Sequence, residues 1–281
     1  MAFFRALETA EPPATRLFDD PLAAGFLGPG LRCVARLCQR SAPRCAVTTL
    51  IDRLWPGARP AGIARTRLID DILRDSLGRG IGQVVILGAG FDARAQRLPC
   101  LAGPRVFEVD QPATLAEKRR RLDALPASRA QPVTYVPVDF NRQRLAEALA
   151  GAGFDAKRAT FFLWEGVTNY LSAEAVDAVM RFVASAAAGS RLLFTYVHRD
   201  VVDHAARFQG TWLLRRTLRR AHEPWTFGLD PSGLTAWLRE RGLALVLDEG
   251  SLAYRERYLG RRERLLRGYE FYRAALAAVR P

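Results

Sequence analysis

The sequence predicts an α/β fold built on a doubly wound parallel sheet. Short apolar runs alternate with helix-compatible segments through most of the 281 residues, and this alternation is typical of parallel sheets with helices on both faces. The first run, residues 84–87, stops at Gly88 and Gly90, and the second, residues 106–109, stops at Asp110. Strand, glycine turn, helix, strand and acid, in that order, indicate the first half of a nucleotide-binding βαβ unit.

The glycine turn, Gly88-Ala89-Gly90, has the residue types that close approach of a ligand requires. Glycine lets the backbone turn sharply, and the start of the following helix offers backbone N–H groups that lack partners. Asp110 stands at the carboxyl end of the next strand. Its carboxylate is therefore placed to accept hydrogen bonds from the hydroxyls of a ribose.

Asp92 separates two interpretations of this unit. Gly88, Gly90 and Ala93 also satisfy the Ala-ended dinucleotide fingerprint, and Asp110 lies 20 residues after Gly90, as that fingerprint requires. A carboxylate at Asp92 would repel a pyrophosphate by roughly 4 kcal/mol per charge pair at about 4 Å and an effective dielectric of about 20. The sulfonium and amine of S-adenosylmethionine (SAM) meet no such repulsion. Asp92 can also act as a helix N-cap, and the two roles can coexist.

The remaining elements are predicted from apolar periodicity and helix caps. One domain, residues 1–281, is expected to comprise a helical cap at 1–80, the SAM-binding core at 81–199, a lid insertion at 200–229 and the rest of the core at 230–281. Further strands are predicted at 133–140, 160–164, 191–197, 243–247 and 252–259. Helices are predicted at 64–73, 111–125, 172–187, 230–241 and the C-terminus.

Composition predicts a cytoplasmic protein without a membrane partner. No apolar run approaches the roughly 20 residues that a membrane span needs, and the N-terminus lacks the charged start and apolar core of a signal peptide. The four cysteines show no paired CxxC spacing. Neither a metal site nor a disulfide framework is therefore expected.

The net charge of +13 is compatible with a nucleic-acid partner. However, only Lys118 and Lys157 of the 42 basic residues are lysines, a bias that GC-rich coding alone produces. The basic clusters at 118–121, 215–220 and 261–267 do not interleave with aromatic residues as a base-stacking surface would. We interpret them as solvated helix faces and expect no nucleic-acid partner, while an acidic substrate stays possible. The sequence does not indicate an oligomeric state.

Five motifs follow one another along the chain, at residues 65–70 (RTRLID), 83–92 (QVVILGAGFD), 106–110 (VFEVD), 136–140 (VPVDF) and 162–170 (FLWEGVTNY). Together they resemble the leucine carboxyl methyltransferase family, and most closely its bacterial branch, which includes O-methyltransferases of polyketide pathways. The resemblance covers roughly residues 60–260. It implies a class I, SAM-dependent methyltransferase with a Rossmann-like, seven-stranded sheet, the last strand antiparallel, and a helical lid.

The same resemblance implies roles for individual residues. Arg65 would hold the SAM carboxylate, Gly88 to Gly90 would lie under the methionine portion, and Asp110 would bind the ribose. Asp139 and Phe140 would flank the adenine, and Glu165 would face the methionine amine. Eukaryotic members carry a Lys before an Asp-Pro pair where this chain has Asp19. Methylation of a phosphatase tail is therefore not implied.

The acceptor decides which side chains the reaction needs. A carboxylate is ionised at neutral pH and needs no general base, whereas a phenol, with a pKa near 10, gains about 10²–10⁴-fold from one. His198, just past the fifth predicted strand, is the candidate base. The alternative interpretation is a surface histidine beside Arg199. Tyr196, Trp225, Phe227, Arg257 and Tyr258 are candidate pocket or lid residues, with core packing as the alternative for each aromatic residue.

The predicted function is methyl transfer from SAM to a carboxylate or phenolic hydroxyl of a small-molecule, polyketide-like acceptor, acidic or aromatic. Two other functional classes stay open at this point. An NAD-dependent oxidoreductase fits the glycine turn but not Asp92 or the acids that end three more strands. A non-catalytic nucleic-acid-binding protein fits only the net charge.

Overall fold

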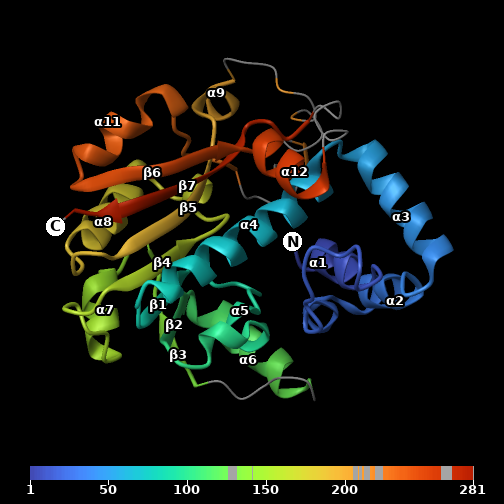
Figure 1. Ribbon diagram of the computed structural model, residues 1–281, viewed down its shortest axis with the longest axis horizontal. Helices are drawn as coiled ribbons and strands as arrows, with labels where there is room; N and C mark the ends of the chain where they lie inside the picture. The colour runs from blue at the N-terminus through green and yellow to red at the C-terminus, as the bar shows by residue number, and fades with distance from the viewer. Residues whose placement is uncertain are drawn as a thin grey trace.

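A seven-stranded sheet forms the centre of the protein (Figure 1). The computed structural model covers residues 1–281, and the structure describes residues 1–125, 132–140, 142–204, 208, 211, 216–218, 224–260 and 268–280. The strands are β1 (Gln83–Leu87), β2 (Arg105–Asp110), β3 (Val133–Pro137), β4 (Thr160–Trp164), β5 (Arg191–Val197), β6 (Leu243–Gly250) and β7 (Tyr272–Val279). Their order across the sheet is β3-β2-β1-β4-β5-β7-β6.

The strand directions confirm the predicted fold class. Strands β1 to β5 pair in parallel, whereas β7 lies between β5 and β6 and is antiparallel to both. The chain order reverses between β1 and β4, which are neighbours in the sheet. In open α/β sheets, ligands bind at the carboxyl ends of the strands beside such a reversal. This edge of the sheet is therefore the place to look for a site.

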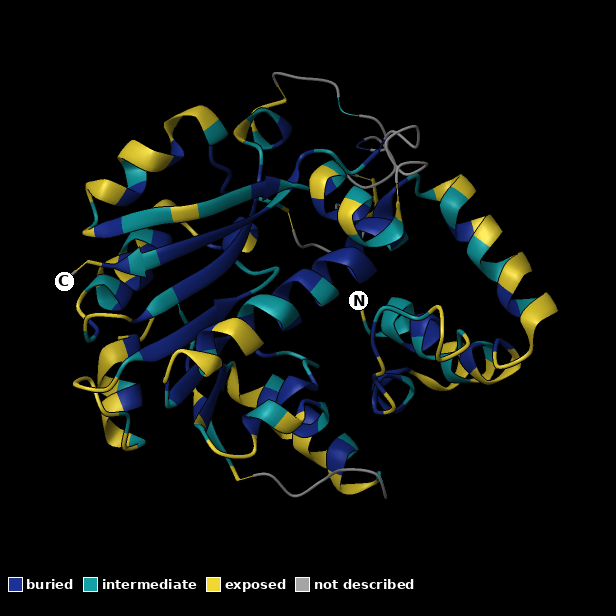
Figure 2. Cartoon of the chain, in the orientation of Figure 1, coloured by how far each residue is buried: buried dark blue, intermediate teal, exposed yellow. Residues whose placement is uncertain are grey.

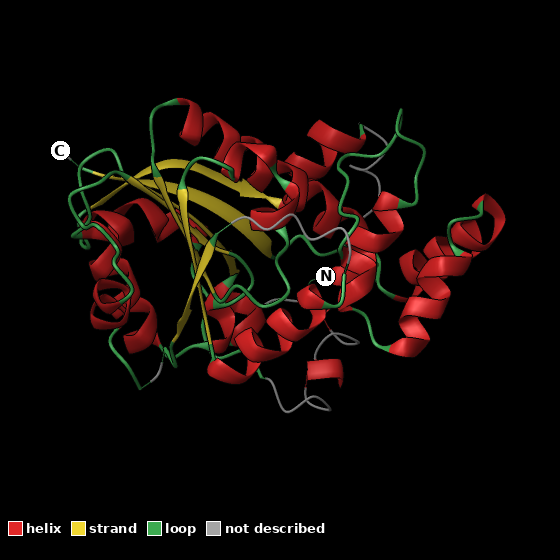
Figure 3. Cartoon of the chain, turned by 90° about the horizontal axis from the view of Figure 1, so that it is seen from below, coloured by secondary structure: helices red, strands yellow, loops and turns green. Residues whose placement is uncertain are grey.

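Helices cover both faces of the sheet (Figure 3), and alternate residues of the central strands belong to opposite core layers. On one face, Val85, Phe162 and Phe194 belong to a core that includes helices α7 (Leu145–Gly151), α8 (Ala173–Ala184) and α11 (Leu234–Arg239). On the other face, Val84 and Phe161 pack with helices α4 (Ala58–Gly78) and α5 (Arg94–Arg97). The central strands are consequently buried on both sides (Figure 2).

The N-terminal part is helical, as predicted, and lies beside the sheet in Figure 1. Its elements are α1 (Ala2–Thr9), η1 (Ala23–Phe26), α2 (Pro29–Leu37), α3 (Ser41–Leu54) and the long helix α4, which leads into β1. The other helices whose bounds the structure describes are η2 (Pro99–Leu101), α6 (Pro112–Asp123), η3 (Thr168–Tyr170), α9 (Arg199–Val202), η4 (Pro231–Gly233) and α12 (Ser251–Leu259). No helix in these described ranges is long and apolar enough to cross a membrane.

Two predicted elements near the C-terminus are wrong. The segment predicted as a strand at 252–259 is helix α12, because Ser251, Tyr254 and Arg255 are buried at helical spacing. The predicted C-terminal helix is strand β7. Its alanines favour helix locally, but β7 lies between two strands and is mostly buried. Tertiary packing therefore overrides the local preference.

The lid predicted at 200–229 lies largely outside the described residues. Its described parts include the end of α9 and residues 224–229, which run alongside the end of β5 through an isolated bridge between His198 and Leu229. The basic clusters at 215–220 and 261–267 also lie mostly or wholly outside the described residues.

The third basic cluster, Lys118–Arg121, is not a solvated face throughout. Lys118 is fully buried and forms an ion pair with Glu108 of β2, which is also fully buried. The Nζ–Oε2 distance is 2.6 Å, although neither group has a well-aligned hydrogen bond. Burial raises the pKa of Glu108, and Lys118 opposes that rise. This pair fixes α6 against β2.

Replacing Lys118 by Met is expected to lower the free energy of unfolding by about 3–5 kcal/mol, because it leaves the Glu108 carboxyl buried without its partner. Urea denaturation would measure this loss. The control is Arg120→Met, since Arg120 pairs with Glu117 on the exposed side of the same helix and should cost at most about 1 kcal/mol. Equal losses in the two variants would contradict the assignment.

Candidate functional site

A cavity of about 240 Å³ opens at the carboxyl ends of β1 and β4. Six predicted cofactor residues line it, namely Arg65, Gly88, Ala89, Gly90, Asp92 and Glu165. Residues of the N-terminal segment, Met1, Ala2 and Arg5, line it as well. Side chains from α4, the glycine turn and the end of β4 therefore meet at the sheet edge where the topology predicts a ligand.

The glycine turn is held in a conformation that favours glycine. Gly88 and Gly90 have positive φ angles of 65° and 44°. A Cβ atom on Gly88 would lie 2.3 Å from Cγ2 of Val167, whereas one on Gly90 would meet only the Gly88 carbonyl oxygen, at an ordinary contact distance of 3.9 Å. The N–H groups of Gly88 and Ala89 both donate to the carbonyl of Val109, at 2.8 and 3.0 Å. The turn is thus packed below and open above, where a ligand can approach the backbone.

Asp110 secures this turn. Its Oδ2 accepts a hydrogen bond from the Gly90 N–H at 2.6 Å, and its Oδ1 accepts one from the Gln111 N–H at 2.7 Å. Asp110 does not itself line the cavity. The predicted ribose contact therefore stays a prediction, and the structure adds a role in positioning the glycine turn.

Arg65 and Glu165 form a buried ion pair at the floor of the cavity. Arg65 Nε donates to Glu165 Oε1 at 2.9 Å, and the guanidinium carbon lies 4.5 Å from the centroid of the Tyr272 ring. Burial lowers the pKa of Arg65, but the Glu165 carboxylate outweighs this effect and raises it. Among the described residues, no protein acceptor hydrogen-bonds the two terminal nitrogens of Arg65. They remain able to bind a carboxylate.

Arg94 joins Asp92 to Glu165. Arg94 Nη1 donates to both carboxylates, at 3.0 Å to Glu165 Oε2. Burial raises the pKa of Asp92, but Arg94 and other cations outweigh it and lower the pKa to about 2. Asp92 Oδ1 also accepts the Arg94 backbone N–H at 2.7 Å, beside the start of α5. A local backbone role and a place in the cavity thus coexist at Asp92.

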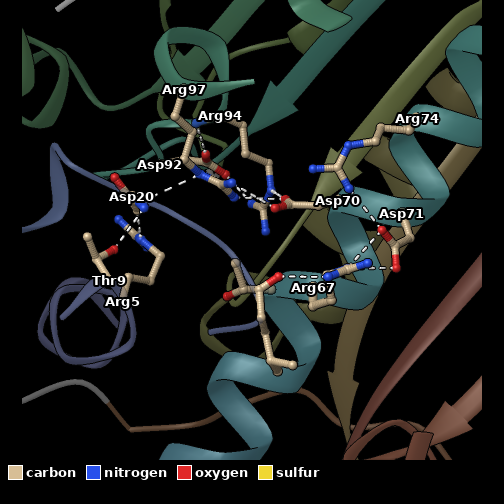
Figure 4. A network of polar contacts seen from close by, with 12 residues as sticks. Arg5, Thr9, Asp20, Arg67, Asp70, Asp71, Arg74, Asp92, Arg94 and Arg97 are labelled. Carbon is tan, nitrogen blue, oxygen red and sulfur yellow. Dashed lines mark hydrogen bonds and ion pairs between the residues drawn. The ribbon is translucent and has the colours of Figure 1, made fainter. Parts of the chain in front are cut away.

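The charges continue from the cavity to the N-terminal helices (Figure 4). Asp70 accepts from Arg94 Nε and Arg97 Nη2, both at 2.8 Å, and Asp20 accepts from Arg5 Nε at 2.7 Å. Arg5 Nη2 donates to the carbonyl of Phe91 at 2.6 Å, immediately after the glycine turn. Sequence reasoning missed Arg5, Arg94 and Arg97, because nothing in their local sequence separates them from the surface arginines.

A second cavity of about 250 Å³ adjoins the first and shares Met1, Arg65 and Gly166 with it. Its other walls include Asn169, Tyr170, Trp225, Tyr269 and Tyr272. Trp225 was a predicted pocket residue, whereas Phe227 packs in the main core. The contributions of Tyr269 and Tyr272 could not be predicted, because they depend on the placement of β7.

Asp139 and Phe140 are not brought to the first cavity. Phe140 lines a separate apolar cavity of about 270 Å³ between α7 and α8. Asp139 Oδ2 lies 3.6 Å from Arg142 Nε, and its backbone N–H donates to Gln143 Oε1. Their predicted contacts with adenine stay predictions.

The two candidate catalytic residues lie away from both cavities. Tyr196 is fully buried, and its hydroxyl lies 3.0 Å from both oxygens of Asp248 and from Arg273 Nε. Burial raises the pKa of Tyr196, and Asp248 raises it further. His198 Nδ1 accepts the Asp200 backbone N–H at 3.3 Å, and its ring packs against Phe208. Their catalytic roles stay predictions without support from these contacts.

The first cavity suits a zwitterionic, amino-acid-like group. The free nitrogens of Arg65 fit a carboxylate, while Glu165 and Asp92 fit an amine or another cation. Open space above Gly90 admits the ligand close to the backbone. The methionine portion of SAM carries a carboxylate, an amine and a sulfonium, so these residues fit SAM.

Comparison with known proteins identifies similar sequences. A family model described as leucine carboxyl methyltransferase matches residues 1–184. A provisionally named S-adenosyl-L-methionine-dependent methyltransferase of Frankia alni is 39% identical over 213 residues, which cover 75% of this chain and 70% of that protein. Another, from Mycolicibacterium smegmatis, is 34% identical over 223 residues, covering 76% and 71%.

Solved structures support the fold. A provisionally named methyltransferase of Thermobifida fusca aligns with a TM-score of 0.57 at 18% identity, covering 98% of this chain and 97% of that one. A DUF574 family protein of Streptomyces avermitilis gives the same TM-score at 16% identity, covering 98% and 100%. At these identities the likeness shows the fold alone.

Arg65→Ala is expected to weaken binding of S-adenosylhomocysteine (SAH) by about 1.5–3 kcal/mol, because it removes charged hydrogen bonds to the ligand carboxylate. Arg65→Lys keeps the charge but loses the planar fork, so it should retain part of the affinity. Calorimetry at one ionic strength measures all variants. The matched control is Arg67→Ala, since Arg67 pairs with Asp71 outside the cavity. If Arg67→Ala weakens SAH binding as much as Arg65→Ala does, general electrostatics explains the loss and Arg65 has no specific contact with the ligand.

The free energy of unfolding should fall as the pH drops from about 4 toward 2. The pKa of Asp92 is about 2 in the folded protein, below its ordinary value of 3.8, so its ionised form stabilises the fold. That contribution is complete above the unfolded pKa and is lost as the pH falls through the folded pKa. Urea denaturation of Asp92→Asn should show a shallower decline over this range. If the free energy of unfolding of Asp92→Asn falls with pH as steeply as that of wild type and of the exposed control Asp203→Asn, the prediction is wrong.

Proposed function

The chain belongs to the leucine carboxyl methyltransferase family and is a SAM-dependent methyltransferase, and we propose that it transfers the methyl group to an oxygen of a small aromatic, polyketide-like acid. The two adjoining cavities carry the proposal. One is charged and lies at the glycine turn, and the other has five aromatic residues among its described lining. They share Arg65 and Gly166, so a donor in the first cavity and an acceptor in the second would meet at that boundary.

SAM supplies an electrophilic methyl group on its sulfonium. The chain's own residues bind and orient the reactants. Arg65 and Glu165 line the first cavity and would bind the carboxylate and amine of the methionine portion, and Asp92 adds negative charge to the same cavity. The aromatic walls of the second cavity exclude water and position the acceptor, which can supply a large part of the rate enhancement.

The second cavity favours a carboxylate over a phenol as the acceptor. Its described lining contains no histidine, aspartate or glutamate that could act as a general base. A carboxylate is already ionised at neutral pH and needs no base, whereas a phenol does.

The alternatives predicted from sequence fit the site less well. A dinucleotide would place its diphosphate beside Asp92 and near Glu165. A nucleic-acid partner would need free basic residues, but in the described cluster at 118–121 Lys118 is buried, and Arg120 and Arg121 pair with Glu117. Both observations favour the methyltransferase.

We expect SAH, but neither NADH nor short DNA, to raise the melting temperature, and we expect methyl esters when SAM and aromatic acids are supplied together. Mass spectrometry combined with alkaline hydrolysis distinguishes an ester from an aryl ether, because only the ester is cleaved. His198→Ala should keep turnover within a few fold, since a carboxylate acceptor needs no base.

A phenol acceptor that uses His198 as its base would give the opposite pattern. The product would resist alkali, and His198→Ala would lose about 10²-fold or more at neutral pH and recover partly as the pH rises. A large loss that pH does not relieve would show that His198 positions the acceptor. No stabilisation by SAH would contradict the donor site itself.

A further inference from the structure

Two buried polar atoms at the second cavity have no hydrogen-bond partner among the residues that the structure describes. They are Oδ1 of Asn169, a residue that is 1% exposed, and Nε1 of Trp225. Both residues line the cavity. Leaving such a group unpaired is costly, and each case in a folded protein calls for an explanation. Trp164 also has an unpaired Nε1, but it lies in the main core and away from this cavity. Asn169 and Trp225 therefore differ from Trp164, because their unpaired polar atoms belong to residues that line a cavity.

The backbone places these two side chains at the same cavity without using their polar atoms. The Thr226 N–H donates to the Asn169 carbonyl at 2.8 Å, and Thr226 Oγ1 donates to the Leu171 carbonyl at 2.9 Å. The Trp225 ring lies 5.9 Å from Phe271 and 6.5 Å from Tyr272, centroid to centroid. The amide of Asn169 and the indole N–H of Trp225 thus remain available while ordinary contacts hold the segment.

We infer that Asn169 and Trp225 are specificity-determining residues that bind a ring hydroxyl of the acceptor, so that the preferred acceptor is a small hydroxylated aromatic acid. This inference rests on the proposed methyl transfer to an aromatic acid. A hydroxyl both donates and accepts hydrogen bonds, so it suits the asparagine amide in either orientation and accepts from the indole N–H.

The size and charge of the cavity agree with this acceptor. An apolar cavity of about 150 Å³ holds benzene, so about 250 Å³ has room for a substituted ring. Arg65 stands at the boundary with the donor cavity, while Asn169 and Trp225 line only the second cavity. An acceptor whose reacting carboxylate faces the donor cavity could therefore reach Asn169 and Trp225 with a ring hydroxyl.

The selectivity follows from the penalty for leaving these groups unpaired. A site built to hydrogen-bond a substrate hydroxyl rejects the analogue that lacks it, because the protein groups then stay buried without partners. We expect the best hydroxybenzoic acid isomer to bind at least about tenfold more tightly than benzoic acid. Asn169→Leu and Trp225→Phe should each remove most of this difference.

The test is calorimetric titration of benzoic acid and the three hydroxybenzoic acids, with and without SAH, into wild type, Asn169→Leu, Trp225→Phe and the control Trp237→Phe. Trp237 lies on α11, away from the cavity. Asn169→Leu should also leave the melting temperature of the ligand-free protein unchanged or raise it, because it removes a buried unpaired group. A merely structural asparagine would lower it.

Three outcomes would overturn the inference. Equal affinity of wild type for benzoic acid and every hydroxybenzoic acid would exclude hydroxyl recognition. Unchanged selectivity in both cavity variants, or an equal loss in Trp237→Phe, would remove Asn169 and Trp225 from that role. Binding of SAH without binding of any of these acids would reject the acceptor class while leaving the donor site intact. Failure of SAH to bind would instead contradict the proposed function.

Discussion

The buried ion pair of Arg65 and Glu165 constrains the rest of the site. A single charge of either sign at this depth would be costly, and removing one partner of such a pair typically costs about 3–5 kcal/mol. Glu165 is therefore held from two sides, by Arg65 of α4 and by Arg94 beside the glycine turn. These contacts fix α4, β4 and the turn relative to one another before any ligand binds.

The same requirement explains why the charged network reaches the N-terminal helices. Arg94 forms ion pairs with Asp70 and Asp92 as well as with Glu165. Asp70 also pairs with Arg97, and Arg97 Nε lies 3.9 Å from Asp20 Oδ2. Including Arg5 and Arg65, the network has four arginines and four acids, so its formal charges cancel. A ligand carboxylate and amine can then enter together without leaving a buried charge unbalanced.

The sequence predicted those parts of the site that depend on local geometry. The glycine turn and the acids after β2 and β4 could be placed because strand ends and turns have local signals. Arg5, Arg94 and the buried Lys118 could not, because a buried cation looks like an exposed one until the packing is known. Strand β7 was missed for a related reason, since its small side chains fit a crowded central position and also favour helix.

Strand β7 links the two cavities. Tyr272 stacks under Arg65, which belongs to both cavities, and its ring forms a wall of the second. Its hydroxyl lies 3.4 Å from Thr195 Oγ1, which accepts the Gly166 N–H at the boundary. The family match ends at residue 184, before Trp225, Tyr269 and Tyr272. The described lining of the first cavity lies entirely in the part of the chain that matches the family, whereas the second cavity also includes Leu218, Trp225, Tyr269 and Tyr272 from beyond it. Under the proposed function, these four residues could differ between family members while Arg65, Glu165 and the glycine turn stay the same.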